Sequence, residues 1–296
     1  MRTSLDCLPC IIRQAVDSSR LVTTDEGTIL AIMKIVFQKL SIANLSSKPP
    51  EIVQEVHAII RKELNHSDPF LSIKQMSTQR ALKLLDEAKM AIGMSENPFA
   101  SAIAFAIAGN ILDFGMKSDW NEEKVAESFS KAPENAKQFD DDTINRMYSE
   151  IDKAKTVLIL GDNAGEAVFD RLLIENFPQK TKTYYAVKSS PVINDVTVNE
   201  AIDSGLDKVA IIISNGADIP GTVLKKCSSD FLEIFNTADV VVSKGQGNFE
   251  TLNEEKRKIW FLFQVKCPVI ARHYNYSVGN WLILEKKDDD ALLFVR

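Results

Sequence analysis

The chain has 296 residues, of which 45% are apolar and 26% charged, an ordinary composition for a globular protein. Its 35 Lys and Arg against 41 Asp and Glu give a formal net charge of −6. This sign argues against a nucleic-acid partner held by a basic face, although it leaves room for a small basic pocket. At roughly 150 residues per domain, the length predicts one large domain or two modest ones.

The apolar segments predict a cytoplasmic protein with no membrane partner. Residues 1–6 are not followed by the uninterrupted apolar core of a secretory signal. The longest apolar stretch, 98–114, contains Asn110 and Asp113 and is shorter than the about 20 residues that a membrane helix needs. Four cysteines are too few for a disulfide scaffold.

The first half of the chain has a helical pattern. Apolar residues recur there at helical spacing, and long β-branched runs are absent. Pro50 and Glu51 suit the first turn of a helix, and Asn97 followed by Pro98 suits another helix start. We expect helices near residues 7–16, 29–40, 50–60, 72–92, 98–114, 121–131 and 140–154. Residues 1–154 are therefore predicted to form an all-α N-terminal domain.

The second half alternates short apolar runs with helical segments. Runs that are typical of buried strands occupy 156–160, 184–187, 209–213 and 240–242, and each is followed by a polar loop and a helical pattern. This alternation predicts an α/β domain over 155–296 with a doubly wound, mostly parallel sheet. Three further runs, at 259–263, 268–271 and 281–284, are predicted as strands. No helix separates the last two, so we expect a mixed sheet edge.

The loops after the four confident strands are expected to share one site, because ligands of open α/β sheets bind at the carboxyl ends of the strands. They span 161–166, 188–195, 214–218 and 243–248. They contain acids, amides and two lysines, and neither His nor Cys. This composition predicts an oxygen-rich site with positive charge for an anion.

The first of these loops favours a metal ion. It lacks both the GxGxxG pattern of dinucleotide sites and the Gly-Lys-Ser/Thr of a Walker A loop. Asp162 and Asn163 place a carboxylate and an amide just beyond a buried strand, and such oxygen ligands suit Mg²⁺ or Mn²⁺. Asp195 becomes a third ligand if its strand neighbours the first. The alternative is that Asp162 caps the following helix.

The fourth loop favours an anion. Lys244 precedes a glycine-containing segment and a helical pattern, so that helix N–H groups and a full positive charge face the same point. The alternative is a tight turn with a solvated lysine. A divalent cation beside such a lysine is suited to a phosphate ester, because both stabilise charge on phosphoryl oxygens.

The same segments resemble the metal-dependent damage-control phosphatases, a family once known only as a domain of unknown function and also including proteins named acidic-residue methyltransferases. Its compact prokaryotic branch carries a CxxC motif. The resemblance spans nearly the whole chain in the right order. The matching segments are 6–10 (DCLPC), 97–99 (NPF), 109–115 (GNILDFG), 161–166 (GDNAGE), 191–197 (PVINDVT) and 243–250 (SKGQGNFE).

The resemblance implies a site and an activity. It implies a divalent ion (Mg²⁺, Mn²⁺, Co²⁺ or Ni²⁺) held by Asp162, Asn163 and Asp195. It implies phosphate contacts at Lys244 and in the turn of Gly245, Gln246 and Gly247. Members of the family hydrolyse phosphate esters of small metabolites, so a small phosphorylated metabolite is the expected partner.

Other polar residues are weaker candidates for substrate contact. The family commonly has Arg and Gly where this chain has Lys188 and serines, and Lys keeps the charge without the two-pronged geometry of Arg. Asn110 and Asp113 lie three apart on one face of an otherwise apolar helix, so both are expected at the cleft unless that helix end emerges into solvent. Asn215 and Asp218 come from the third loop.

The predicted reaction is attack of water on phosphorus, with Asp162, Asp195, Lys244 and Asp113 as catalytic candidates. Asp113 or Asp195 would orient the water. Two rivals stay open: carboxyl methyl transfer from S-adenosylmethionine, and metal or metabolite binding without turnover. Cys7 and Cys10 are predicted as small buried residues at a helix start, against a zinc or a redox site.

Overall fold

The computed structural model describes residues 1–110, 129–178 and 180–286. Its helices are α1 (Cys7–Arg20), α2 (Glu26–Ser41), α3 (Pro49–Glu63), α4 (Leu71–Gly93), α5 (Pro98–Gly109), α7 (Ala132–Ala136), α8 (Asp141–Lys153), α9 (Ala167–Glu175), α10 (Val198–Asp203), α11 (Ser229–Thr237), α12 (Gly245–Leu252) and α13 (Pro268–Tyr274). Its strands are β1 (Thr156–Leu160), β2 (Lys182–Val187), β3 (Ile211–Ser214), β4 (Val240–Lys244), β5 (Ile259–Gln264) and β6 (Trp281–Lys286). Among these residues no helix is long and apolar enough to cross a bilayer.

The strands form one twisted sheet in the order β3-β2-β1-β4-β5-β6. All neighbouring pairs are parallel except β5 and β6, which are antiparallel. The prediction of a mostly parallel α/β sheet with a mixed edge is therefore confirmed. Strand order reverses between β1 and β4, and doubly wound sheets place their ligands at such a reversal.

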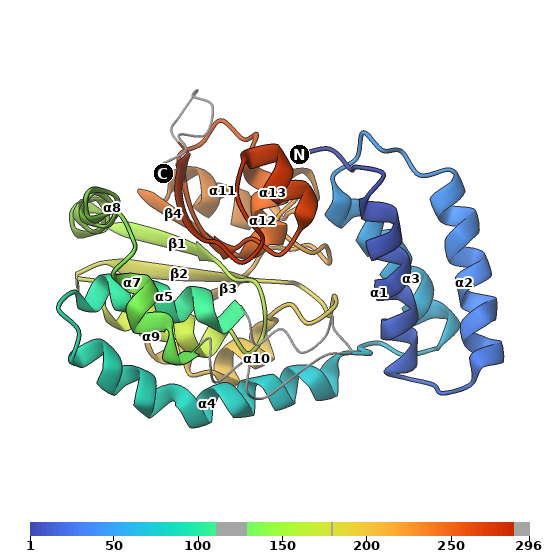
Figure 1. The fold of residues 1–296 in the computed structure, drawn as a ribbon, viewed down its shortest axis with the longest axis horizontal. Coiled ribbons are helices and arrows are strands. Elements are labelled where there is room, and N and C mark those ends of the chain that lie inside the picture. Colours follow the sequence, from blue (N-terminus) through green and yellow to red (C-terminus); the bar gives the residue numbers. More distant parts are fainter. Residues whose placement is uncertain (111–128, 179, 287–296) are drawn as a thin grey trace.

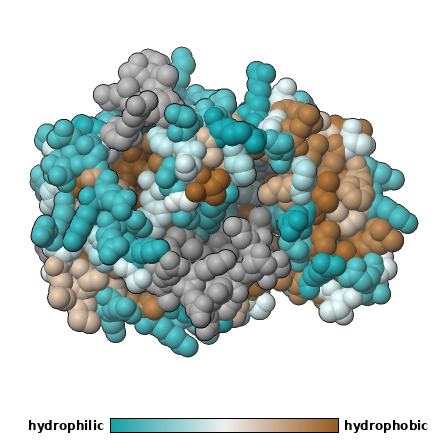
Figure 2. Space-filling view, in the orientation of Figure 1, coloured by the Kyte–Doolittle hydropathy of each residue, from teal (hydrophilic) through white to brown (hydrophobic). Residues whose placement is uncertain are grey.

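The first three helices form a cluster of their own, drawn in blue in Figure 1. Apolar residues spaced three and four apart along each helix point into this cluster, as the sequence pattern predicts. Figure 2 shows that apolar side chains also gather on the outer surface over this part of the molecule.

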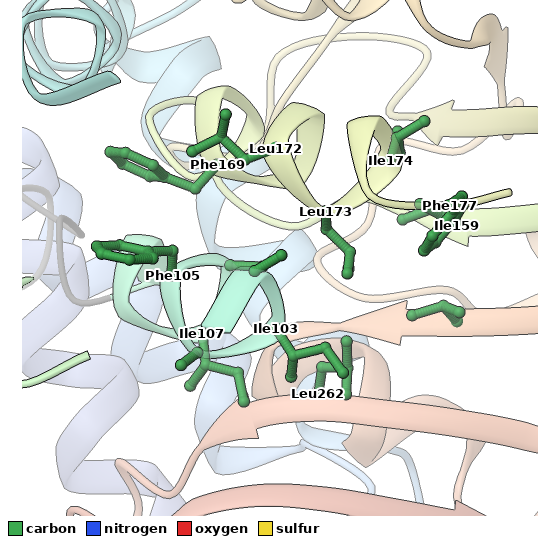
Figure 3. Packing of buried hydrophobic residues seen from close by; sticks show 14 of the residues in the cluster. Ile103, Phe105, Ile107, Ile159, Phe169, Leu172, Leu173, Ile174, Phe177 and Leu262 are labelled. Atoms are coloured by element: carbon green, nitrogen blue, oxygen red, sulfur yellow. The ribbon is translucent and has the colours of Figure 1, made fainter. Parts of the chain in front are cut away.

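Helix α5 is buried all round, because eleven of its residues, from Phe99 to Gly109, are buried. Alternating alanines let it pack closely against α9, and a Cβ at Gly109 would lie 2.8 Å from the ring of Phe169. Figure 3 shows Phe105 and Phe169 facing each other across this contact, with Ile159 and Leu262 of the sheet in the same cluster. One core thus joins α5 to the sheet.

Side-chain caps fix the start of several helices. Asp25, Asn97 and Asp140 each accept the backbone N–H three residues further on, at 2.7–3.0 Å. Such caps satisfy N–H groups that the first helical turn leaves without partners. They explain why the predicted helices near 29–40, 98–114 and 140–154 begin where they do.

One sequence-based expectation differs from the structure, and a second is tested only as far as residue 110. Residues 268–271 were expected as a strand, but they begin α13, in which Pro268 occupies the first turn, where its missing N–H is not needed. The α-helix expected to reach Gly115 is assigned only to Gly109, and residues 111–128, which include most of the helix expected at 121–131, lie outside the described part. The division at residue 154 stays a prediction, since one core cluster contains residues from both sides of it.

A buried lysine ties α4 to α10. Lys74 is 1% exposed, and its Nζ lies 2.7 Å from Oδ2 of Asp68 and 2.9 Å from Oε1 of Glu200. Two carboxylates around one ammonium group keep each charge paired, which a buried charge requires. This contact fixes the helices beside the second loop.

Candidate active site

The predicted metal-binding residues meet where the strand order reverses. Asp162 and Asn163 follow β1, and backbone contacts join their loop to the loop after β2. Asn163 and Asp195 form an antiparallel β-bridge, and the N–H of Val196 donates to the carbonyl of Asp162 at 2.8 Å. The second and first loops are therefore joined through their backbones, and both Asp side chains are buried.

The Asp162 carboxylate is held by two amides. Its Oδ2 accepts Nδ2 of Asn110 at 2.7 Å and Nδ2 of Asn163 at 3.0 Å. The same two amides also donate to Oε2 of Glu166, at 2.5 and 3.3 Å. Glu166, not Asp162, is the N-cap residue of α9, so the helix-cap alternative for Asp162 is wrong. Asn110 is brought to the site as the residue that follows α5.

Three carboxylates crowd one another here: Asp162, Glu166 and Asp195, called the carboxylate cluster below. Burial raises the pKa of Asp162 well above its usual value, and the charges of Glu166 and Asp195 raise it further, while Lys266 and the Asn110 hydrogen bond oppose them. A dication would relieve this repulsion.

The donor chemistry fits such an ion. Two carboxylates and the amide of Asn163 are the hard oxygen donors that Mg²⁺ and Mn²⁺ take. Within the described ranges, no group of three His, Cys, Asp or Glu side chains is arranged to hold a metal. The predicted ligand set contains two such side chains, those of Asp162 and Asp195, together with the amide of Asn163.

Lys244 lies beneath the site instead of facing outward. Its side chain is fully buried, and Nζ donates to the carbonyl of Ala106 at 2.9 Å, to Oδ1 of Asp170 at 2.6 Å and to Oε1 of Glu166. An ammonium group has three N–H donors, and these three acceptors use them all. This placement differs from the predicted phosphate contact, because two acids of α9 draw the ammonium into the core.

The network continues to two residues that the sequence argument missed. The hydroxyl of Tyr185, on β2, donates to Oδ2 of Asp170 at 2.7 Å, and both side chains are fully buried. Burial raises the pKa of Tyr185 well above its usual value, and Asp170 adds to the rise, so the hydroxyl keeps its proton. One signal was available: Asp170 lies four residues after Glu166, on the same helical face, and the three residues between them are apolar.

Gly245 allows the turn after β4 to approach Asp162. Its φ is +75°, and a Cβ there would lie 1.9 Å from Oδ2 of Asp162. Gln246 was predicted to contact phosphate. In the structure its Oε1 instead accepts the backbone N–H groups of Lys266 and Cys267, at 3.0 and 3.1 Å. Gly247 packs against Gly221. A Cβ added at Gly221 would lie 2.3 Å from the carbonyl oxygen of Gly247.

The other predicted binding residues brace the loops. Lys188 is 2% exposed; its Nζ donates to the carbonyl of Gly221 and lies 3.4 Å from Oδ2 of Asp195. The side chain of Asn215 accepts a backbone N–H of its own loop, from Ala217 at 2.9 Å. The Lys188 contact joins the second loop to the segment that follows the third loop, and the Asn215 contact fixes the third loop itself.

Asp218 connects the third loop to the N-terminal helices. Its Oδ2 accepts Nε2 of Gln54 and Nη2 of Arg61, each at 3.3 Å, and both donors lie on α3. Arg61 also donates to the carbonyl of Pro191 in the second loop at 3.1 Å. Helix α3 is thereby fixed against two loops of the sheet edge, a connection for which the sequence held no signal.

Lys266 is a further cation, which the prediction from the four loops did not include. It follows β5, and its Nζ donates to the carbonyl of Asn110 at 2.6 Å. Asp113, which was also predicted as a catalytic residue, lies outside the described residues. The four cysteines are free thiols, and Cys7 begins α1 as expected. Cys7 is half-buried but Cys10 is exposed, so only the helix start is confirmed.

Comparison with known proteins identifies the family. The damage-control phosphatase ARMT1-like domain matches residues 3–281. The chain belongs to the ARMT1-like damage-control phosphatase family. The sequence-based resemblance is thus confirmed. A damage-control phosphatase of Pyrococcus horikoshii is 32% identical, with 97% of this chain and 99% of the relative aligned.

Two other relatives are similarly distant. A damage-control phosphatase of Archaeoglobus fulgidus is 30% identical over 95% of this chain and 98% of the relative. An uncharacterised protein of Methanocaldococcus jannaschii is 31% identical over 95% and 94%. Among solved structures, the crystal structure of a DUF89 family protein from P. horikoshii superposes with a TM-score of 0.86 at 32% identity, covering 96% of this chain and 98% of the other.

Proposed function

We propose that this family member is a divalent-metal-dependent phosphatase that hydrolyses phosphate esters of small metabolites. Membership of a phosphatase family supports phosphate-ester chemistry. The observation that carries the metal requirement is the pair of buried carboxylates, Asp162 and Asp195, brought together by the β-bridge between Asn163 and Asp195 at the reversal of strand order.

The charge of the site supports a cation requirement. The carboxylate cluster and Asp170 supply four acidic groups, and Lys188 and Lys244 supply two ammonium groups in contact with them. A phosphate monoester carrying up to two negative charges would be repelled by this excess of carboxylates. We infer that Asp162, Asn163 and Asp195 hold Mn²⁺, Co²⁺, Ni²⁺ or Mg²⁺. Such an ion would neutralise the carboxylates and polarise a phosphoryl oxygen.

The protein's own residues would then keep the ligands in place. Asn110 holds the Asp162 carboxylate from one side, and the close backbone of Gly245 limits its movement from another. Lys188 holds Asp195 through their ion pair. Fixed ligands reduce the reorganisation that the reaction would otherwise require.

A metal-by-substrate screen tests the proposal. Purified protein is stripped with a chelator and assayed for phosphate release from sugar phosphates and other small phosphomonoesters, with each of the four ions and with none. We expect ion-dependent release that Asp162→Asn and Asp195→Asn abolish. Asp86→Asn, at an exposed position on α4, should retain full activity and serves as the matched control.

The outcomes separate the candidate functions. No release from any substrate with any ion would overturn the proposal, and so would full activity in both Asp162→Asn and Asp195→Asn. Ion-dependent ligand binding without release would favour a binding protein. Calorimetric binding of S-adenosylmethionine without release would favour the methyltransferase.

A further inference from the structure

The unassigned residues Asp170 and Tyr185 form the inner end of a continuous polar chain that leads to the candidate metal ligands. The chain runs from the Tyr185 hydroxyl through Asp170 and Lys244 to Glu166, and from there through the amide of Asn163 to Asp162. All these side chains are at most 8% exposed, and those of Tyr185, Asp170, Lys244 and Glu166 are fully buried.

Each link in this chain has an orienting consequence. Asp170 takes one N–H of Lys244, and the carbonyl of Ala106 takes another, so the third N–H is directed at Oε1 of Glu166. With Oε1 held by the ammonium, Oε2 of Glu166 is turned toward the amides of Asn110 and Asn163. Those amides are the groups that hold the Asp162 carboxylate.

Charge balance explains why the chain needs its inner end. The positive charge of Lys244 is shared between Glu166 and Asp170, so one carboxylate in the buried group is in excess. The Tyr185 hydroxyl donates to the far oxygen of Asp170 and thereby stabilises that carboxylate. Without this donor, Asp170 would compete more strongly for Lys244, and the link to Glu166 would loosen.

We propose that Asp170 and Tyr185 are positioning residues of the metal site, acting through Lys244 and Glu166 on the ligands Asp162 and Asn163. This inference rests on the proposed function. Removing residues that orient metal ligands through hydrogen bonds lowers metal affinity by about 10–100-fold. Neither residue touches the ion or the substrate.

The test measures metal affinity and turnover separately in Tyr185→Phe and Asp170→Asn. Mn²⁺ binding to chelator-stripped protein is followed by calorimetry without substrate, and phosphate release is followed at saturating Mn²⁺. Tyr184→Phe is the matched control for the tyrosine, because Tyr184 is the preceding, half-buried residue of the same strand. Asp86→Asn is the control for the aspartate. Far-UV circular dichroism checks that each variant is folded.

We expect Tyr185→Phe to weaken Mn²⁺ binding by about tenfold and Asp170→Asn by up to about 100-fold. At saturating Mn²⁺, kcat should fall more than KM changes, since the chain positions ligands and does not bind substrate. If Asp170→Asn does not fold, Tyr185→Phe, which keeps the ring, decides the question. A purely structural role would lower stability without changing Mn²⁺ affinity.

The inference is overturned if Tyr185→Phe and the control Tyr184→Phe agree within twofold in both Mn²⁺ affinity and kcat. That result would leave the proposed function intact. If the wild-type protein binds Mn²⁺ but releases no phosphate with any of the four ions, the proposed phosphatase function fails, and the affinity measurements still test the positioning role. Wild-type protein that neither binds any of the four ions nor releases phosphate with any of them would overturn both.

Discussion

Glu250 offers the sharpest test of the electrostatics of this fold. It lies buried on α12, and its Oε1 accepts Nε2 of Gln246 at 2.9 Å. Burial raises its pKa from an ordinary 4.5 to about 7, although the Gln246 hydrogen bond and the amino group of Met1 act in the opposite direction. The folded protein therefore binds this proton more tightly than the unfolded chain does. Its contribution to stability is present below the unfolded pKa and is lost as the pH rises through about 7.

The size of the effect follows from the two pKa values. Their difference corresponds to about 3 kcal/mol of unfolding free energy between about pH 4 and about pH 8. Glu250→Gln keeps the shape of the side chain and removes the titration. The stability of this variant relative to wild type should therefore increase by about 3 kcal/mol over that range, since other titrating groups cancel in the comparison.

Urea denaturation followed by circular dichroism at several pH values measures this difference. Glu233→Gln, at an exposed position on α11, is the matched control for replacing a glutamate by glutamine. If the difference in unfolding free energy between Glu250→Gln and wild type stays constant between about pH 4 and about pH 8, Glu250 is not a buried group whose ionisation destabilises the fold.

Three other predictions concern the site and its support. Gly245→Ala would place a Cβ 1.9 Å from Oδ2 of Asp162, so the displaced carboxylate should lower kcat/KM by on the order of 100-fold; unchanged phosphate release would contradict the role of Asp162. We expect Mn²⁺ to raise the Tm of the wild-type protein, by a stabilisation of about 2.7 kcal/mol at 100 times Kd, and we expect Asp162→Asn to abolish that rise; a thermal scan showing an equal rise in the variant would contradict this. Lys74→Met should destabilise the protein by about 3–5 kcal/mol in urea, because two buried carboxylates lose their counter-ion, and a loss under about 1 kcal/mol would speak against that pairing.

Much of the fold was predictable because buried parallel strands and amphipathic helices have distinct patterns. The run at 268–271 was not, since a short apolar stretch has no periodicity that separates a strand from a helix. Its Pro268 was the available clue, because proline suits a first helical turn.

The site was predictable as a location but less so as a set of contacts. Loops after parallel strands must meet at one edge, so Asp162 and Asp195 could be placed together from the sequence. The direction of a long side chain could not be predicted: Lys244 ends its strand at that edge, yet its ammonium turns into the core toward Asp170. Lys266 was passed over because its strand was not among the four whose loops were considered.

Helix α5 has a consequence for any attempt to shorten this protein. The carbonyl of Ala106 and the amide of Asn110 belong to the upstream half of the sequence, yet both contact polar groups of the downstream half. A fragment starting at residue 155 would keep every proposed ligand and lose these two contacts, as well as the part of the apolar core that α5 supplies. We therefore expect the smallest fragment that keeps the contacts of the candidate site to include α5, and recombination between relatives should exchange α5 and α9 together.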